Sequence, residues 1–268
     1  MSEAAAISTI STSREWKNRL RLPPDGTSRS QDSEWCEIRE ADGWRRLRFH
    51  DYGEIYERPG LYEYLFYDLL ECQSPRRVVG LLGEVRADMD SKDPLRVIDF
   101  GAGNGLVGKE LRRIGAVEVV GMDILEEARA AARRDLPGVY SDYLVADMTA
   151  PEKRVDQRLR ALRPNALTCV AALGFGDIPP RAYYNAASYV SIGGLLAFNI
   201  KEEFLDARYT HGFAEMMRQM VNGGVVRLEA TRRYRHRNSA AGEPIFYTAM
   251  VATKLKEIPE SMLVEEEK

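Results

Sequence analysis

Short apolar runs alternate with amphipathic segments through the middle of the chain. The runs are rich in Val, Ile, Leu and Phe and have the length of buried strands; they cover residues 96–100, 117–122, 143–148, 166–171 and 195–200. The segments between them have helical spacing or composition, at 106–114, 125–134, 154–162 and 181–190. Strands that alternate with helices are typical of a parallel sheet with helices on both faces.

Two longer segments close this pattern, at 225–234 and 245–254, with the loop 238–242 between them. Strands that are adjacent in sequence and joined by a short loop pair antiparallel. The pattern therefore predicts an α/β fold built on a seven-stranded, mostly parallel sheet with one antiparallel edge strand.

The first third of the chain follows a different pattern. Residues 1–33 are polar and rich in Ser and Thr, so we expect a flexible or loosely docked arm, in which Trp16 is the exception, either as an anchor of the arm or as a cover over a substrate. Large apolar and charged residues alternate on both sides of Asp42-Gly43, which predicts a hairpin. We therefore expect an arm (1–33), a flap and helical lid (34–94), a core (95–256) and a tail (257–268).

The turn after the first predicted strand holds the candidate chemistry. Gly101, Gly103 and Gly105 stand at alternate positions and let a ligand approach the backbone closely, and a helix follows from Leu106. The next strand ends in Asp123, where a carboxylate usually binds ribose hydroxyls. A dinucleotide fingerprint G-x-G-x-x-G would require glycine in place of Leu106, so a nicotinamide dehydrogenase is the weakest alternative.

The run Asp99-Phe100-Gly101-Ala102-Gly103-Asn104-Gly105 resembles the first motif of class I S-adenosylmethionine-dependent methyltransferases. The resemblance extends over about residues 50–254. It implies a Rossmann-like fold, S-adenosyl-L-methionine as the cofactor with S-adenosyl-L-homocysteine as the product, and methyl transfer to oxygen, nitrogen, sulfur or carbon.

The resemblance also implies roles for particular residues. The turn, including Ala102 and Asn104, would pass under the cofactor, with Asp99 beneath its methionine portion. Asp123 and Ile124 would lie at the ribose. The adenine and the sulfonium end would be framed by Asp147, Met148 and Leu173. An Asp after a strand is also a common helix cap, and this alternative applies to Asp147.

The segment His50 to Glu57 resembles the Tyr/Asp-rich lid that precedes the core in small-molecule members of this class, so Tyr52 and Tyr56 are expected to line the cofactor pocket. The match is partial, because histidine stands where a first tyrosine is common. If the acceptor must lose a proton, His50 is the first candidate for the base and His211 the reserve.

The loop 172–180 follows the fourth strand at the edge where ligands bind in open α/β sheets, so Phe175 is a candidate for stacking on the substrate. The surroundings of Pro179-Pro180 lack the asparagine and tyrosine of the N-P-P-Y motif of amino-modifying DNA and protein-glutamine methyltransferases. This departure argues against nucleic-acid methylation.

Charge and cysteine content narrow the partners. The net charge of −3 gives no global attraction to nucleic acid, and the basic run Arg232 to Arg237 alternates between strand faces, which favours a solvated sheet end over a phosphate site. Three scattered cysteines predict neither a disulfide framework nor a metal site. The absence of an apolar stretch of bilayer length and of a signal pattern predicts a cytoplasmic protein without membrane contact.

We therefore expect a small-molecule methyltransferase that is a monomer or a homodimer. Two alternatives stay open from the residues: a methyltransferase with a protein or RNA acceptor, and a catalytically silent protein that binds S-adenosylmethionine as a regulator.

Overall fold

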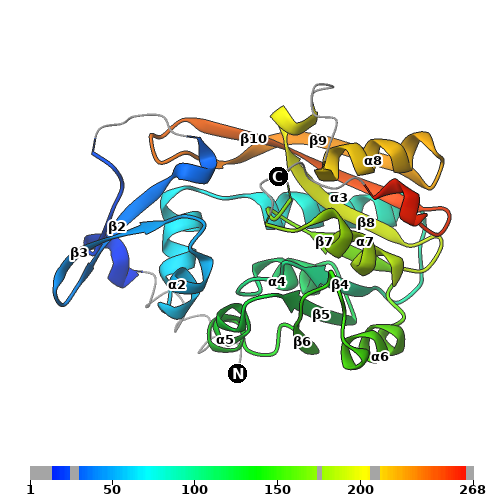
Figure 1. Cartoon of the computed structure of the whole chain (residues 1–268), viewed down its shortest axis with the longest axis horizontal. Helices are drawn as coiled ribbons and strands as arrows, with labels where there is room; N and C mark the ends of the chain where they lie inside the picture. Colours follow the sequence, from blue (N-terminus) through cyan, green and yellow to red (C-terminus); the bar gives the residue numbers. More distant parts are fainter. Residues whose placement is uncertain (1–13, 25–29, 174–176, 206–211, 264–268) are drawn as a thin grey trace.

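The computed structural model describes residues 14–24, 30–173, 177–205 and 212–263, which form a large sheet with helices and a smaller N-terminal sheet beside it (Figure 1). The large sheet has seven strands in the order β6-β5-β4-β7-β8-β10-β9. Their bounds are β4 (Arg96–Phe100), β5 (Glu118–Asp123), β6 (Asp142–Val145), β7 (Ala166–Cys169), β8 (Leu195–Lys201), β9 (Val226–Asn238) and β10 (Pro244–Lys254).

The pairings β6-β5-β4-β7-β8 are parallel, and β10 runs antiparallel to both β8 and β9. This confirms the predicted mostly parallel sheet with antiparallel pairing at one edge. The reversed strand is β10, the last in sequence, and β9 lies outside it. β6 ends at Val145, earlier than predicted, so residues 146–148 leave the sheet.

Six helices accompany the large sheet, and their apolar faces form separate cores on its two sides. Their bounds are α3 (Ser74–Asp88), α4 (Leu106–Arg113), α5 (Glu126–Asp135), α6 (Lys153–Leu162), α7 (Pro180–Ser188) and α8 (Gly212–Asn222). Alternation along β4 sends Val97 to the core under α3 and α4, and Ile98 and Phe100 to the core under α6, α7 and α8. Helices therefore cover both faces, as predicted.

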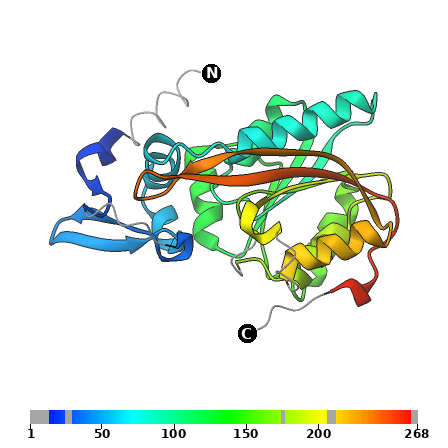
Figure 2. The same cartoon turned by 90° about the horizontal axis from the view of Figure 1, so that it is seen from above.

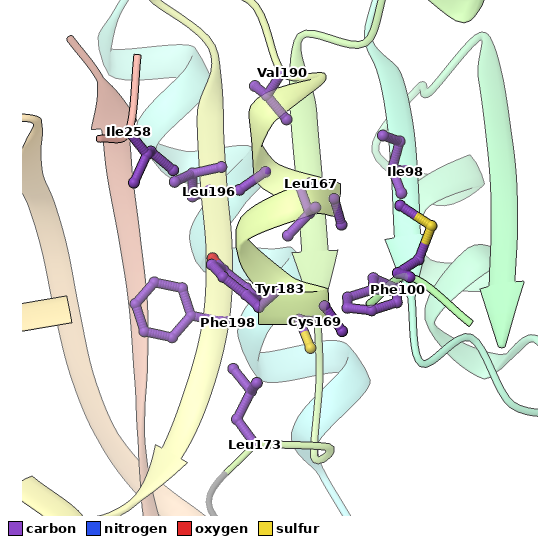
Figure 3. Close-up of a cluster of buried hydrophobic side chains, with 14 of the residues drawn as sticks. Ile98, Phe100, Leu167, Cys169, Leu173, Tyr183, Val190, Leu196, Phe198 and Ile258 are labelled. Atoms are coloured by element: carbon purple, nitrogen blue, oxygen red, sulfur yellow. The ribbon is translucent and has the colours of Figure 1, made fainter. Parts of the chain in front are cut away.

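The second of these cores is centred on an aromatic cluster (Figure 3). Tyr183 of α7 meets Phe198 of β8 and Phe213 of α8 edge to face, with ring centroids 6.3 and 4.7 Å from that of Tyr183. Tyr183 and Phe198 are fully buried. Such edge-to-face pairs add about 0.5–1.5 kcal/mol each beyond the area they bury, so this cluster fixes α7 and α8 against the strand.

The predicted hairpin is present as β2 (Trp35–Glu40) and β3 (Gly43–Arg48), and β1 (Leu20–Arg21) adds a third strand. In the short helix η1 (Glu15–Asn18), Trp16 is buried and its Nε1 donates to the carbonyl of Pro59 at 2.9 Å. A second short helix, η2 (Gln31–Ser33), leads into β2. The described part of the arm is therefore docked rather than flexible, because strand pairing and burial of Trp16 order it.

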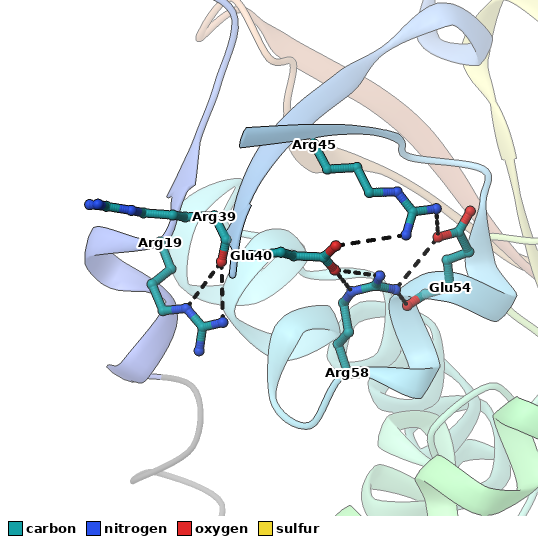
Figure 4. Close-up of polar contacts among 6 residues, drawn as sticks. All are labelled: Arg19, Arg39, Glu40, Arg45, Glu54 and Arg58. Atoms are coloured by element: carbon teal, nitrogen blue, oxygen red, sulfur yellow. Dashed lines mark hydrogen bonds and ion pairs between the residues drawn. The ribbon is translucent and has the colours of Figure 1, made fainter. Parts of the chain in front are cut away.

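The small sheet is tied to α2 (Tyr52–Glu57) by charged side chains (Figure 4). The guanidinium of Arg58 lies 2.6 Å from the Glu40 carboxylate, and Arg45 pairs with Glu54. After α2, the segment predicted to be a helical lid contains a π-helix, η3 (Glu63–Leu69). Wider π turns are frequent at functional sites.

The β9–β10 hairpin extends past the end of the large sheet toward this N-terminal layer (Figure 2). The amide of Gln73 donates to the carbonyl of His236, and the amide of Asn238 donates to that of Leu70. Arg237 and Glu34 form an ion pair at 2.5 Å, and both side chains are buried. The hairpin thus holds the N-terminal layer across the carboxyl ends of the strands. Two further short helices are η4 (Glu202–Leu205) and η5 (Glu260–Met262).

Candidate active site

The glycine turn after β4 has the geometry that its sequence predicts. Gly101, Gly103 and Gly105 have φ angles of 71°, 51° and 98°, in the left-handed region that favours glycine. The amides of Gly101 and Ala102 both donate to the carbonyl of Met122, at 2.9 Å. These bonds hold the turn against the end of β5.

Asp99 lies under this turn and is fully buried. One carboxylate oxygen accepts from the hydroxyl of Tyr140 at 2.6 Å, and the other accepts from that of Thr168 at 2.7 Å. Burial raises the pKa of Asp99 to about 6. Asp99 therefore supports the turn from below, and its side chain does not line a cavity. Gly108 and Gly121 leave the space that the Tyr140 ring fills.

Asp123, at the end of β5, faces the turn. Its carboxylate accepts from the amide of Gly103 at 3.0 Å and from the amide of Leu125 at 3.1 Å. Burial raises the pKa of Asp123 above its ordinary value, against the effect of these bonds. The next side chain, Ile124, is 65% exposed.

A cavity of about 220 Å³, here called the outer cavity, opens over the ends of β4 and β5. Of the predicted cofactor residues, its walls include Tyr52, Tyr56, Gly101, Asp123, Ile124, Asp147 and Met148. Asp147 also holds its own turn, because its carboxylate accepts from the amide and the hydroxyl of Thr149 at 2.8 and 2.7 Å. Asp147 does not cap a helix, because the next helix, α6, begins at Lys153 with Glu152 as its N-cap, so the cap alternative is wrong and the contact with adenine stays a prediction.

A second, smaller cavity of about 60 Å³, here called the inner chamber, lies behind the outer one. The two cavities share one wall, formed by Tyr52, Tyr56, Tyr62, Gly101, Val170, Ala171, Ala172 and Asp177. Ala102, Gly103 and Asn104 line only the inner chamber. The predicted cofactor loop is thus divided between the two cavities.

The segment predicted to be a lid supplies a row of aromatic rings to the shared wall. Ring centroids of Tyr52 and Tyr56 are 6.2 Å apart, and those of Tyr56 and Tyr62 are 5.0 Å apart. A Cβ atom added to Gly103 would lie 2.5 Å from the Tyr56 hydroxyl, so lid and turn are in close contact. His50 also lines the inner chamber, with its ring stacked on Tyr52 at 5.6 Å.

Lid and turn are joined a second time through Asn104, whose amide donates to Glu63 of η3 at 2.5 Å. The other carboxylate oxygen of Glu63 is buried and has no hydrogen-bond partner in the described part of the chain. Burial raises the pKa of Glu63 to about 7.

A buried polar network behind the shared wall was not predicted. Ala171 has a φ of 58°, unusual for a residue with a Cβ, and its amide donates to Asn199 at 2.6 Å. The amide of Asn199 donates to the Tyr234 hydroxyl at 2.7 Å, and Ser74 lies 2.6 Å from Nδ1 of His236. Single polar residues within apolar strands were the only sequence signal for it.

Some predicted site residues lie elsewhere. Leu173 is 2% exposed, packs in the core under α7 and lines neither cavity, so its place at the adenine and the sulfonium end stays a prediction. Gly105 packs against Val139 and Tyr140 and lines neither cavity. Phe175 and His211 lie outside the described residues.

The described residues contain no group of three or more His, Cys, Asp or Glu side chains that would hold a metal ion. Within the described ranges, no helix is both long and apolar enough to cross a bilayer.

A family described as a methyltransferase domain matches residues 98–198, which span β4 to β8 and the glycine turn. Residues 98–198 are a class I S-adenosylmethionine-dependent methyltransferase domain. The protein is therefore an S-adenosylmethionine-dependent methyltransferase, and S-adenosylmethionine is its cofactor. No curated protein sequence matches this chain.

Solved structures share the fold of this methyltransferase at low identity. A candidate RNA methyltransferase from Pyrococcus horikoshii matches with a TM-score of 0.50 and 14% identity, over 69% of this chain and 87% of that one. Magnesium protoporphyrin IX methyltransferase from Synechocystis matches with a TM-score of 0.46 and 14% identity, over 67% of this chain and 79% of that one. A methyltransferase from Clostridium acetobutylicum matches with a TM-score of 0.47 and 9% identity, over 68% and 92%.

Proposed function

We propose that this methyltransferase acts on a small-molecule acceptor that binds in the inner chamber. The observation that carries the proposal is the wall shared by the two cavities, since donor and acceptor must meet across a common surface. The chamber is enclosed by the lid, by Gln31 of the N-terminal segment and by the β9–β10 hairpin. An enclosed chamber suits a small acceptor better than the side of a macromolecule.

The charges on β9 support the same proposal. Each arginine of the run 232–237 pairs with a carboxylate: Arg232 with Glu84, Arg233 with Glu202, Arg235 with Glu71 and Arg237 with Glu34. These carboxylates neutralise the one basic run of the sequence, which weakens it as a docking surface for a polyanion.

The residues of the outer cavity fit the cofactor. Gly101 of the left-handed turn lines this cavity, and the Asp123 carboxylate lies where ribose hydroxyls would donate to it. Asp147 and Met148 would hold the adenine. The rings of Tyr52, Tyr56 and Tyr62 would face the positive sulfonium, which aromatic faces attract.

When bound, S-adenosylmethionine supplies an electrophilic methyl carbon, whose bond to sulfur breaks as a lone pair of the acceptor forms the new bond. The work of this chain is to align the acceptor across the shared wall and to exclude water from it. An oxygen or nitrogen acceptor also releases a proton. His50 is the proposed recipient, because its ring lines the chamber beside Tyr52 and Asp177.

The function is tested by following conversion of S-adenosylmethionine to S-adenosylhomocysteine with three acceptor panels: small molecules, peptides and RNA. We expect turnover with small molecules and little dependence on salt. Turnover confined to RNA that falls steeply with salt, or confined to peptides, would contradict the proposal. Cofactor binding without turnover on any panel would favour a silent regulator.

The role of His50 is tested with His50→Ala on the acceptor identified in that screen. Loss of a positioned base lowers turnover by about 10²–10⁴-fold, and the loss should diminish as pH rises and the acceptor ionises by itself. An unchanged turnover rate would remove His50 from the mechanism.

A further inference from the structure

Three side chains from distant parts of the chain meet in the inner chamber. Gln31 comes from η2, and His236 and Tyr247 come from β9 and β10. The side-chain amide of Gln31 donates to the Tyr247 hydroxyl at 2.8 Å. The His236 ring stacks on the Tyr247 ring, with centroids 4.2 Å apart. None of the three lines the outer cavity.

The carbonyl oxygen of the Gln31 side chain, Oε1, is unused. Gln31 is 8% exposed, and Oε1 is buried without a hydrogen-bond partner among the residues that the structure describes. In the structure Nε2 faces the Tyr247 hydroxyl, and this orientation leaves Oε1 as the unpaired atom of the amide. A buried acceptor without a donor costs about 1–3 kcal/mol. A bound molecule that donates a hydrogen bond to this oxygen would remove that cost.

The remaining walls are mostly flat rings. They belong to Phe49, His50, Tyr52, Tyr56, Tyr62, Phe66, Tyr67, His236 and Tyr247. Aromatic rings attract other rings in stacked or edge-to-face contact, with a gain that a saturated ring of similar size does not obtain. The chamber is also the smaller of the two cavities, which suits a compact acceptor.

The cationic Arg237 of the chamber does not favour an acidic acceptor. The guanidinium of Arg237 is paired with Glu34 at 2.5 Å, and Glu34 accepts in addition from the amide of Ala240. Both members of the pair are buried, at 3% and 1% exposure, so an acidic ligand would have to displace Glu34 from Arg237.

We propose that the inner chamber binds a compact, non-acidic aromatic acceptor that carries an O–H or N–H group donating to Oε1 of Gln31. The inference rests on the proposed function and names the class of its substrate. Because Gln31 lines the chamber but not the outer cavity, the group it holds is not the group that is methylated. The acceptor therefore has a second nucleophilic atom that reaches the shared wall.

The probes for this proposal are phenol, anisole and cyclohexanol, added to the full-length protein saturated with S-adenosylhomocysteine. Phenol has both the ring and the donor, anisole lacks the donor, and cyclohexanol lacks the aromatic ring. Binding is measured by saturation-transfer NMR titration. We expect phenol to bind roughly tenfold more tightly than anisole, since one hydrogen bond to a buried acceptor distinguishes them, and also more tightly than cyclohexanol.

Gln31→Met tests the assigned oxygen, because methionine has a similar shape without an acceptor of comparable strength. It should abolish the preference for phenol over anisole and leave the affinity for S-adenosylhomocysteine unchanged. Gln31→Glu keeps an acceptor oxygen and should keep the preference. Gln157→Met, on the exposed side of α6, is the matched control and should behave as the unmodified protein.

Equal binding of phenol and anisole, binding of cyclohexanol as tight as that of phenol, or no binding of any probe would overturn this inference. Displacement of phenol by S-adenosylhomocysteine would overturn it too, because the chamber would then belong to the cofactor. None of these results bears on turnover of other small molecules, so the acceptor panels decide the proposed function separately.

Discussion

The two cavities are built in different ways. The walls of the outer cavity come largely from the ends of neighbouring strands and the loops after them, and Asp123 bonds to Gly103 only 20 positions away. The inner chamber joins η2, the lid and the β9–β10 hairpin, and its Gln31–Tyr247 bond spans 216 positions. The cofactor side is therefore local in sequence, and the acceptor side is assembled by tertiary contacts.

The residues of the two sides are therefore held in place by separate sets of contacts. The glycine turn and Asp123 need only a strand, a turn and a neighbouring strand to reach their positions. The acceptor side depends on contacts that hold the N-terminal layer against the hairpin, above all the buried Arg237–Glu34 pair. A substitution should consequently impair the cofactor side without the acceptor side, or the acceptor side without the cofactor side.

The largest effect is expected for Glu34→Gln, which would leave the buried Arg237 guanidinium without a compensating charge. Loss of one member of a buried pair costs about 3–5 kcal/mol, measured as the free energy of unfolding in urea. The matched control is Glu84→Gln, since its pair with Arg232 is 55% and 44% exposed and should contribute less than about 1 kcal/mol. Equal losses for the two variants would contradict the assembled character of the acceptor side.

Asp123→Ala is expected to weaken binding of S-adenosylhomocysteine by about 100-fold. The substitution removes the carboxylate that is proposed to bind the ribose, together with its charged hydrogen bonds from the amides of Gly103 and Leu125. Calorimetric titration measures the loss. Asp147→Ala serves as the comparison within the same cavity. Its carboxylate is exposed and bonded to Thr149, so we expect less than about a tenfold loss. A larger loss for Asp147 than for Asp123 would reverse their proposed roles.

Glu63 makes the contact between lid and turn dependent on pH. Its folded pKa of about 7 lies above the ordinary value of 4.5, so the folded protein binds this proton more tightly, and stability is lost as pH rises from 4.5 to 7. The loss is on the order of 1–3 kcal/mol. Glu63→Gln should be the more stable form at pH 8 and should lose this difference at pH 4. Parallel stability curves for the two proteins across this range would refute the assignment.

Gly103→Ala tests the close contact between turn and lid. The new Cβ would meet the Tyr56 hydroxyl at 2.5 Å, in a backbone conformation that is already unfavourable for alanine. We expect binding of S-adenosylhomocysteine to weaken roughly tenfold, with partial rescue when Tyr56→Phe removes the hydroxyl. Gly115→Ala is the matched control, because its φ of 87° gives the same strain in open space. A similar loss of binding in this control would show that lid contact is not the cause.

The smallest effect is expected for Ala171→Gly. Relief of the left-handed conformation should raise the free energy of unfolding by at most about 1 kcal/mol, and the bond from its amide to Asn199 should persist. Arg163 also has a left-handed φ, of 48°, and lies far from both cavities. Arg163→Gly should therefore increase stability by a similar amount, measured by thermal unfolding. Clear destabilisation by Ala171→Gly alone would mean that its methyl group is needed in the shared wall.

Sequence alone determined the sheet, the glycine turn and Asp123, because each depends on short-range pattern: apolar runs give strands, left-handed turns require glycine, and consecutive parallel strands end at one edge. The same pattern did not determine the hydrogen-bond partners of a polar side chain on a strand. Asp99 reads as a cofactor contact in the motif, yet its carboxylate is taken by Tyr140 and Thr168.

Only the tertiary structure decided the acceptor chamber. Gln31 stands in a segment that its composition marks as flexible, and it becomes a wall residue because the pairing of β1 and the Arg237–Glu34 contact bring that segment to the hairpin. Likewise the run 232–237 is basic in sequence, but pairing with carboxylates from other elements neutralises it. Contacts between residues about 200 positions apart depend on the packed fold as a whole, which no local pattern encodes.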